Sequence, residues 1–146
     1  TATTVGGVIG RVAWGAIADR MLALRRVLAL IGLIAGVCGL TLACATPEWP
    51  VALVLPLAAV FGGTAIGWNG VQLSELARHA PHGGAGAVTG AAGVITFAGV
   101  VAGPPLFAAL AALTSGYRSG FVVFSLVSLG SAAAFHWRRS QEAMPV

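Results

Sequence analysis

The chain has 146 residues, of which 58% are hydrophobic and only 8% are charged. About a quarter of the residues of a soluble domain are charged, so this composition excludes an ordinary soluble globular domain. The formal net charge of +4 comes from arginines spread among short polar segments. This spacing excludes a basic patch of the kind that binds nucleic acid and instead favours an integral membrane protein.

Five apolar segments follow one another along the chain. We expect helices over residues 1–18, 27–45, 51–73, 85–113 and 120–137, followed by a tail over 138–146. These lengths are near the roughly 20 helical residues that span a hydrocarbon core. Alternation with a period of two is absent, which favours helices over the strands of a β-barrel. The expected fold class is an all-α polytopic bundle of about five transmembrane helices.

A charged run separates the first two expected helices. The segment from Asp19 to Arg26 holds four of the chain's twelve charged side chains, between two long apolar stretches. This pattern is typical of a chain that leaves a bilayer and turns straight back. Arg11 precedes Asp19 on the first helix and lies about 12 Å deeper in the membrane than Asp19. It is either an intramembrane charge, with Glu75 as a partner, or a side chain that snorkels to the interface.

The arginines are distributed unevenly between the two sides of the expected bundle. One side holds Arg20, Arg25, Arg26, Arg78, Arg138 and Arg139, whereas the loops of the other side hold only Arg118. Because cytoplasmic loops are enriched in Arg and Lys, the side with six arginines is predicted to be cytoplasmic. The C-terminus is then cytoplasmic as well.

A polar stripe runs along the third expected helix. It comprises Thr64, Trp68, Gln72 and Glu75, with Asn69 at its flank. An amide in hydrocarbon is costly without a partner or water, so the stripe is expected to face inward, as part of a substrate pathway or gate. Hydrogen bonds to neighbouring helices explain Asn69 and Gln72 equally well. On the fourth helix, Thr96 either packs against a neighbouring helix or lines a cavity.

Small residues predict where helices touch. Glycines stand four residues apart in every expected helix except the last, at Gly6/Gly10, Gly32/Gly36, Gly63/Gly67, Gly86/Gly90 and Gly99/Gly103. Such pairs let another helix backbone approach closely. Cys38 and Cys44 lie six apart in one helix, on different faces, so no disulfide is expected between them.

The charged run and later segments resemble transporters of the major facilitator superfamily. The stretch from Gly15 to Arg20, with Asp19, followed by Arg25 and Arg26, resembles the G-x-x-x-D-R-x-G-R-R loop of that family. The longer spacing and missing Gly resemble the second copy of this loop, between the eighth and ninth helices. Glu75 with a following Pro and Gly-Ala-Gly resembles the loop before the eleventh helix. Residues 103–107 and 114–117 resemble the eleventh helix leading into the twelfth.

This resemblance implies a part of the C-terminal six-helix domain of a secondary transporter, over residues 1–146. Two halves of such a transporter rock around a central site, which implies a small-molecule substrate and a missing N-terminal half as partners. The resemblance also implies a conformational loop and charge network formed by Gly15, Asp19, Arg20, Arg25 and Arg26, with Glu75 and Arg11 as further charges. The first, third and fourth helices would face the cavity or the other half, and the second and fifth would face lipid.

Other classes of function find less support in the sequence. The four acids are well separated and there is no Lys, so no enzyme active site is indicated and no cofactor is expected. His79 and His82 flank a proline without a third ligand nearby, which argues against a metal site. A structural, non-transporting membrane subunit remains the alternative function. The expected location is a cell membrane, by composition a bacterial inner membrane; the substrate, and whether protons are coupled to its movement, are left open.

Overall fold

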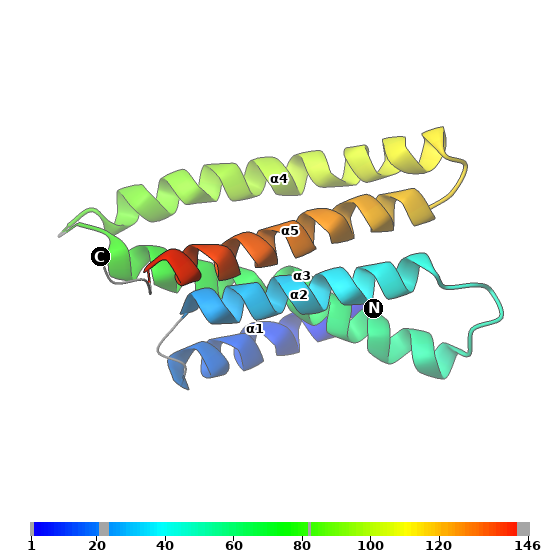
Figure 1. Ribbon diagram of the computed structural model, residues 1–146, viewed down its shortest axis with the longest axis horizontal. Coiled ribbons are helices and arrows are strands. Elements are labelled where there is room, and N and C mark those ends of the chain that lie inside the picture. The colour runs from blue at the N-terminus through cyan, green and yellow to red at the C-terminus, as the bar shows by residue number, and fades with distance from the viewer. Residues whose placement is uncertain (1, 21–23, 82, 143–146) are drawn as a thin grey trace.

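The computed structural model describes the backbone of residues 2–20, 24–81 and 83–142, and the side chains of these residues except 19, 24 and 136–142. These ranges form five helices and contain no strand. The helices are α1 (Ala2–Arg20), α2 (Leu24–Ala43), α3 (Val51–His79), α4 (Ala85–Leu113) and α5 (Arg118–Glu142) (Figure 1). The expected all-α helical bundle is therefore confirmed.

The helix ends differ from expectation most clearly at the end of α3. We expected a polar loop from Ser74 onward, but the helix continues to His79. The segment contains no glycine or proline before Pro81, and the residue before a proline is disfavoured in helical conformation. Ala80 accordingly adopts φ −71° and ψ 142°, which ends the helix. Glu75 and Arg78 therefore lie on the last turns of α3 rather than in a loop.

The other helix ends shift by smaller amounts. α2 begins at Leu24, three residues earlier than expected, and ends at Ala43 rather than at residue 45. α5 begins at Arg118 and continues to Glu142, so part of the expected tail is helical. α4 covers the expected range and continues as one helix through Pro104 and Pro105. The missing N–H groups of these two prolines do not interrupt it.

Four of the helices in the described part of the chain are long and apolar enough to cross a membrane. They are segments of α2, α3, α4 and α5, and the apolar part of α1, Ala2–Ala18, is shorter. Large apolar side chains such as Val94 and Ile95 on α4 are more than 70% exposed. Exposure of this extent is unfavourable in water but not in a bilayer, so the chain is a multi-pass membrane protein.

α1 and α3 cross through their glycines. A methyl group placed on Gly10 would lie 2.6 Å from the Cα of Gly63, and one placed on Gly6 would lie 2.8 Å from the Cα of Ala59. Gly67 lies against the ring of Trp14, whose Cδ1 would be 2.7 Å from an added methyl. Two backbones can approach this closely only where side chains are absent.

α2 and α5 form the second close pair. A methyl group on Gly36 would lie 2.5 Å from the Cγ of Leu129, and one on Gly32 would lie 3.3 Å from the Cβ of Ala132. The Ser128 hydroxyl donates a hydrogen bond of 2.9 Å to the carbonyl oxygen of Gly32. The predicted close approaches are thus confirmed for the glycines of α1, α2 and α3.

α4 stands apart at the edge of the bundle, and it has no buried residue (Figure 1). Gly86, Gly90, Gly99 and Gly103 have no atom within 4 Å of the position that a methyl group would take. For these two pairs the expected close helix contact is therefore wrong in this structure. The described contacts of α4 with α5 gather near its C-terminal end, where Phe107 lies against Phe121 and Phe124.

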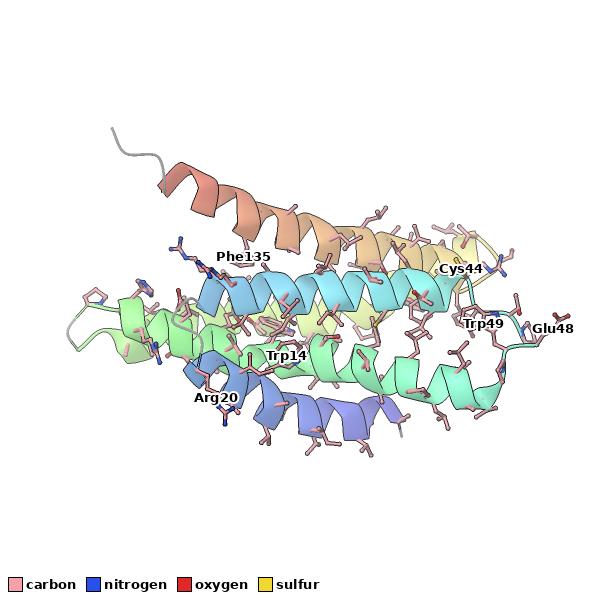
Figure 2. The ribbon with its side chains drawn as sticks, turned by 60° about the horizontal axis from the view of Figure 1, so that its bottom comes forward. Trp14, Arg20, Cys44, Glu48, Trp49 and Phe135 are labelled. Atoms are coloured by element: carbon pink, nitrogen blue, oxygen red, sulfur yellow. The ribbon has the colours of Figure 1, made fainter. Side chains whose placement is uncertain are left out.

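Successive helices run in opposite directions. The C-terminal ends of α1, α3 and α5 and the N-terminal ends of α2 and α4 lie at one end of the bundle, and the opposite ends of these helices lie towards the other (Figure 1). Figure 2 shows Arg20 and Phe135 near the first end and Cys44, Glu48 and Trp49 at the second. A small core of Ala18, Val27, Ile31 and Val71, covered by Trp14, Leu28 and Trp68, joins α1, α2 and α3 towards the first end.

Candidate functional site

A cavity of about 770 Å³ lies between α2, α3, α4 and α5. Three polar residues of α3 line it together with three serines of α5, several aromatic rings, and small residues of α2 and α4. Its residues on α4 all belong to the stretch from Gly99 to Phe107, and α1 contributes none. Ligand-binding cavities typically measure about 300–1,000 Å³, so this one is large enough for a small molecule.

The cavity brings together three of the five residues that we predicted for a pathway or gate. Thr64, Trp68 and Gln72 line it, as a stripe along one face of α3 requires, whereas Asn69 and Thr96 are not among its lining residues. The Asn69 amide donates a hydrogen bond of 3.3 Å to the carbonyl oxygen of Ile66. Neither expected reading of Asn69 is seen, because its partner belongs to its own helix.

Two of the three polar lining residues of α3 have satisfied donors. The Thr64 hydroxyl donates within α3, at 3.0 Å to the carbonyl of Val60 and 2.9 Å to that of Phe61. The Trp68 indole N–H donates to the carbonyl of Ala65 at 2.9 Å. Each hydrogen bond returns to the helix's own backbone, so the polar atom can be placed in an apolar environment at little cost.

Gln72 differs from Thr64 and Trp68. Its side chain is half-buried and lines the cavity, and no hydrogen bond of its amide is found within the described part of the chain. An amide in this position has two donors and an acceptor available for a ligand or water. Gln72 and Ser125 are the polar lining residues for which no side-chain hydrogen bond is found in the described part of the chain, and the amide of Gln72 has the larger unused capacity.

Our expectation that α2 and α5 face only lipid is wrong for this cavity. Ser125, Ser128 and Ser131 of α5 line it, as do Ile31 and Ala35 of α2. The serines stand three residues apart and therefore share one face of α5. That spacing was the available signal in the sequence. We missed it because serine is only weakly polar, and a helix with nothing more polar than Ser, Thr and Cys was expected to face lipid.

The end of the bundle that holds Arg20, Arg25 and Arg26 is called the arginine-rich end below. An aromatic cluster bounds the cavity on the side away from this end. The ring of Phe107 lies 5.4 Å from that of Phe121, 6.0 Å from that of Phe124 and 6.4 Å from that of Tyr117, between ring centres. Phe61 of α3 meets Phe121 edge-on at 6.2 Å. Rings at these distances attract one another beyond their apolar burial. The cluster joins α3, α4 and α5.

The charged residues lie beyond the other end of the cavity. The Glu75 carboxylate oxygen Oε1 is 3.9 Å from Nε of Arg25 and 3.7 Å from Nδ1 of His79. No ion pair joins Arg11 to Glu75 among the described side chains, so the alternative in which Glu75 is the partner of Arg11 is not seen. Arg11 itself is exposed on the surface of α1.

The other residues of the predicted charge network are Gly15, Asp19, Arg20 and Arg26. Gly15 has no atom within 4 Å of an added methyl, and Arg20 and Arg26 are exposed at the same end of the bundle. The side chain of Asp19, which we predicted as part of this network, lies outside the described part of the structure. Met21, Leu22 and Ala23, which join α1 to α2, are also outside it.

Comparisons of this chain with protein families, with curated proteins and with solved structures find no match.

Proposed function

We propose that this chain is part of a secondary transporter of the major facilitator superfamily, which moves a small solute across a cell membrane by alternating access. The observation that carries the proposal is the cavity among helices of membrane-spanning length, lined by the polar stripe of α3. The resemblance of residues 15–26 to the family's conserved loop adds independent support. Transport by rigid-body rocking requires such a site between helices that can move relative to one another.

The orientation in the membrane is part of this proposal. The arginine-rich end faces the cytoplasm, and the end with Cys44 and Glu48 faces outward, because Arg-rich loops are retained in the cytoplasm. In intact cells we expect a membrane-impermeant maleimide to label the exposed native Cys44 and to spare the buried Cys38. A single cysteine at Pro81, in a background without Cys38 and Cys44, should react only after the cells are opened. Labelling of Pro81→Cys in intact cells, together with no labelling of Cys44 in the original chain, would contradict this orientation.

Alternating access can be tested with a cysteine inside the cavity. Ala65 lies near the middle of α3 and lines the cavity with an exposed side chain, so Ala65→Cys is a small change at a central position. We expect an impermeant thiol reagent to reach this cysteine both in intact cells and in inside-out vesicles. Val60→Cys, exposed on the same helix but outside the cavity, should react from neither side, because lipid excludes the reagent.

The same experiment separates the transporter from a structural membrane subunit. A subunit with one fixed conformation would expose the cysteine at position 65 from one side only, or from neither. That result, obtained with normal membrane insertion of the variant, would contradict alternating access.

A further inference from the structure

The size of the cavity between α2, α3, α4 and α5 restricts what can fill it. A helix about 10 Å across occupies roughly 420 Å³ per turn of 5.4 Å. The cavity of about 770 Å³ therefore holds fewer than two turns, far less than another membrane-spanning helix. Its volume instead corresponds to a small organic molecule.

The residues that line the cavity favour a flat, uncharged ligand. Six aromatic side chains border the cavity: Phe61 and Trp68 of α3, Phe107 of α4, and Phe121, Phe124 and Phe135 of α5. No Asp, Glu, Lys or Arg is among the described lining residues. A charged group placed there would lose its hydration without gaining a counter-ion, which is strongly unfavourable. Aromatic rings, in contrast, bind other rings by stacking or edge-on contact.

The polar atoms of the lining restrict the ligand further. The hydroxyl protons of Thr64 and Ser128 and the indole proton of Trp68 are already donated to backbone carbonyls. Among the described residues the Gln72 amide has no such partner, and it lies on the side of the cavity towards Glu75 and Arg25, which are paired with each other. No hydrogen bond of the Ser125 hydroxyl is found there either, so Gln72 and Ser125 are the two neutral hydrogen-bonding sites that remain in an otherwise apolar, aromatic space.

We propose that this cavity binds an uncharged molecule with an aromatic body and one neutral polar end group, such as a hydroxyl or amide, which hydrogen-bonds to Gln72. The aromatic body lies among the rings of Phe107, Phe121 and Phe124. This inference names the substrate class of the proposed transporter and rests on that function for its meaning in transport. Binding itself is an equilibrium property, so its failure is distinguishable from a failure of alternating access.

Three related photoreactive probes test the ligand class with the chain in lipid nanodiscs. They are 4-(hydroxymethyl)benzophenone, benzophenone without the hydroxyl, and the anion 4-benzoylbenzoate. We expect the alcohol to label the chain saturably, at lining residues that mass spectrometry can identify. Benzophenone should bind about fivefold more weakly, because it lacks one hydrogen bond. The anion should label no lining residue. In Gln72→Leu, the alcohol and benzophenone should bind equally, which a merely structural effect of the substitution would not produce.

A matched glycine pair on α4 tests the location. Neither Gly99 nor Gly90 has an atom within 4 Å of an added methyl, but only Gly99 lines the cavity. Gly99→Leu should therefore fill the cavity and weaken labelling at least tenfold, and Gly90→Leu should leave it unchanged. Equal labelling in both variants, or equal affinity of the three probes, would overturn the proposal. Displacement of 4-(hydroxymethyl)benzophenone by an equimolar amount of hexadecanol would also overturn it, in favour of a site for a lipid chain.

Discussion

Gly10→Leu is expected to separate α1 from α3. A methyl group at this position already overlaps the backbone of Gly63, whose Cα would be 2.6 Å away, and neither backbone can move without displacing the neighbouring crossing at Gly6. Overpacking of a close contact typically costs 1–3 kcal/mol, and the overlap here is with main chain rather than with a flexible side chain. We expect the free energy of unfolding to fall by about 3 kcal/mol, measured by SDS titration of the purified chain in mixed micelles.

Gly90→Leu is the matched control for Gly10→Leu. It makes the same change in another membrane-length helix, at a glycine with no atom within 4 Å of an added methyl. Exposed substitutions usually change stability by no more than about 0.5 kcal/mol, so this variant should unfold like the original chain. Equal destabilisation by the two substitutions would mean that the α1–α3 crossing contributes no more to stability than an open face of α4.

The glycine pairs also show what the sequence could and could not predict. Spacing of four residues identifies a face that another backbone can approach, and for Gly6, Gly10, Gly32 and Gly36 a helix of this chain occupies that face. The same spacing occurs at Gly86 and Gly90, where no helix approaches. Spacing reports that a face is available, but it contains no information about which helix occupies it.

For the candidate site, too, the sequence predicted one face of a helix but not the helices that lie against it. The periodicity of α3 places Thr64, Trp68 and Gln72 on one face, and these residues do line one cavity. The partners of that face could not be predicted in the same way, because they depend on which helices lie beside α3. The resemblance implied that α2 faces lipid, and its lack of strongly polar residues agreed with this, yet a helix without polar groups can equally line an apolar cavity.

The charged end shows how a helix boundary affects a predicted contact. One of our two interpretations of Arg11 paired it with Glu75, which we placed in a polar loop after the third helix. Continuation of α3 to His79 instead places Glu75 on a helical turn near the start of α2, where Arg25 lies 3.9 Å away. This ion pair links the first turn of α2 to the last turns of α3.

Phe107→Ala is expected to release α4 from the bundle. No residue of α4 is buried, and the ring of Phe107 contacts three other aromatic rings, those of Tyr117, Phe121 and Phe124. Loss of these contacts from a half-buried position should lower the free energy of unfolding by about 2 kcal/mol. Spin labels at the exposed positions Leu106 and Leu126, in a background without native cysteines, should show a broader distance distribution between α4 and α5.

Phe97→Ala separates the loss of an attachment from the loss of a large apolar side chain. Phe97 lies on the same helix and is 69% exposed, and within the described part of the chain it has no ring contact. Its removal should leave both the stability and the distance distribution unchanged, since a lipid-facing ring has no protein partner to lose. If Phe97→Ala broadened the distances as much as Phe107→Ala, α4 would be positioned by its apolar surface in the bilayer. The aromatic cluster would then be a consequence of that position and not its cause.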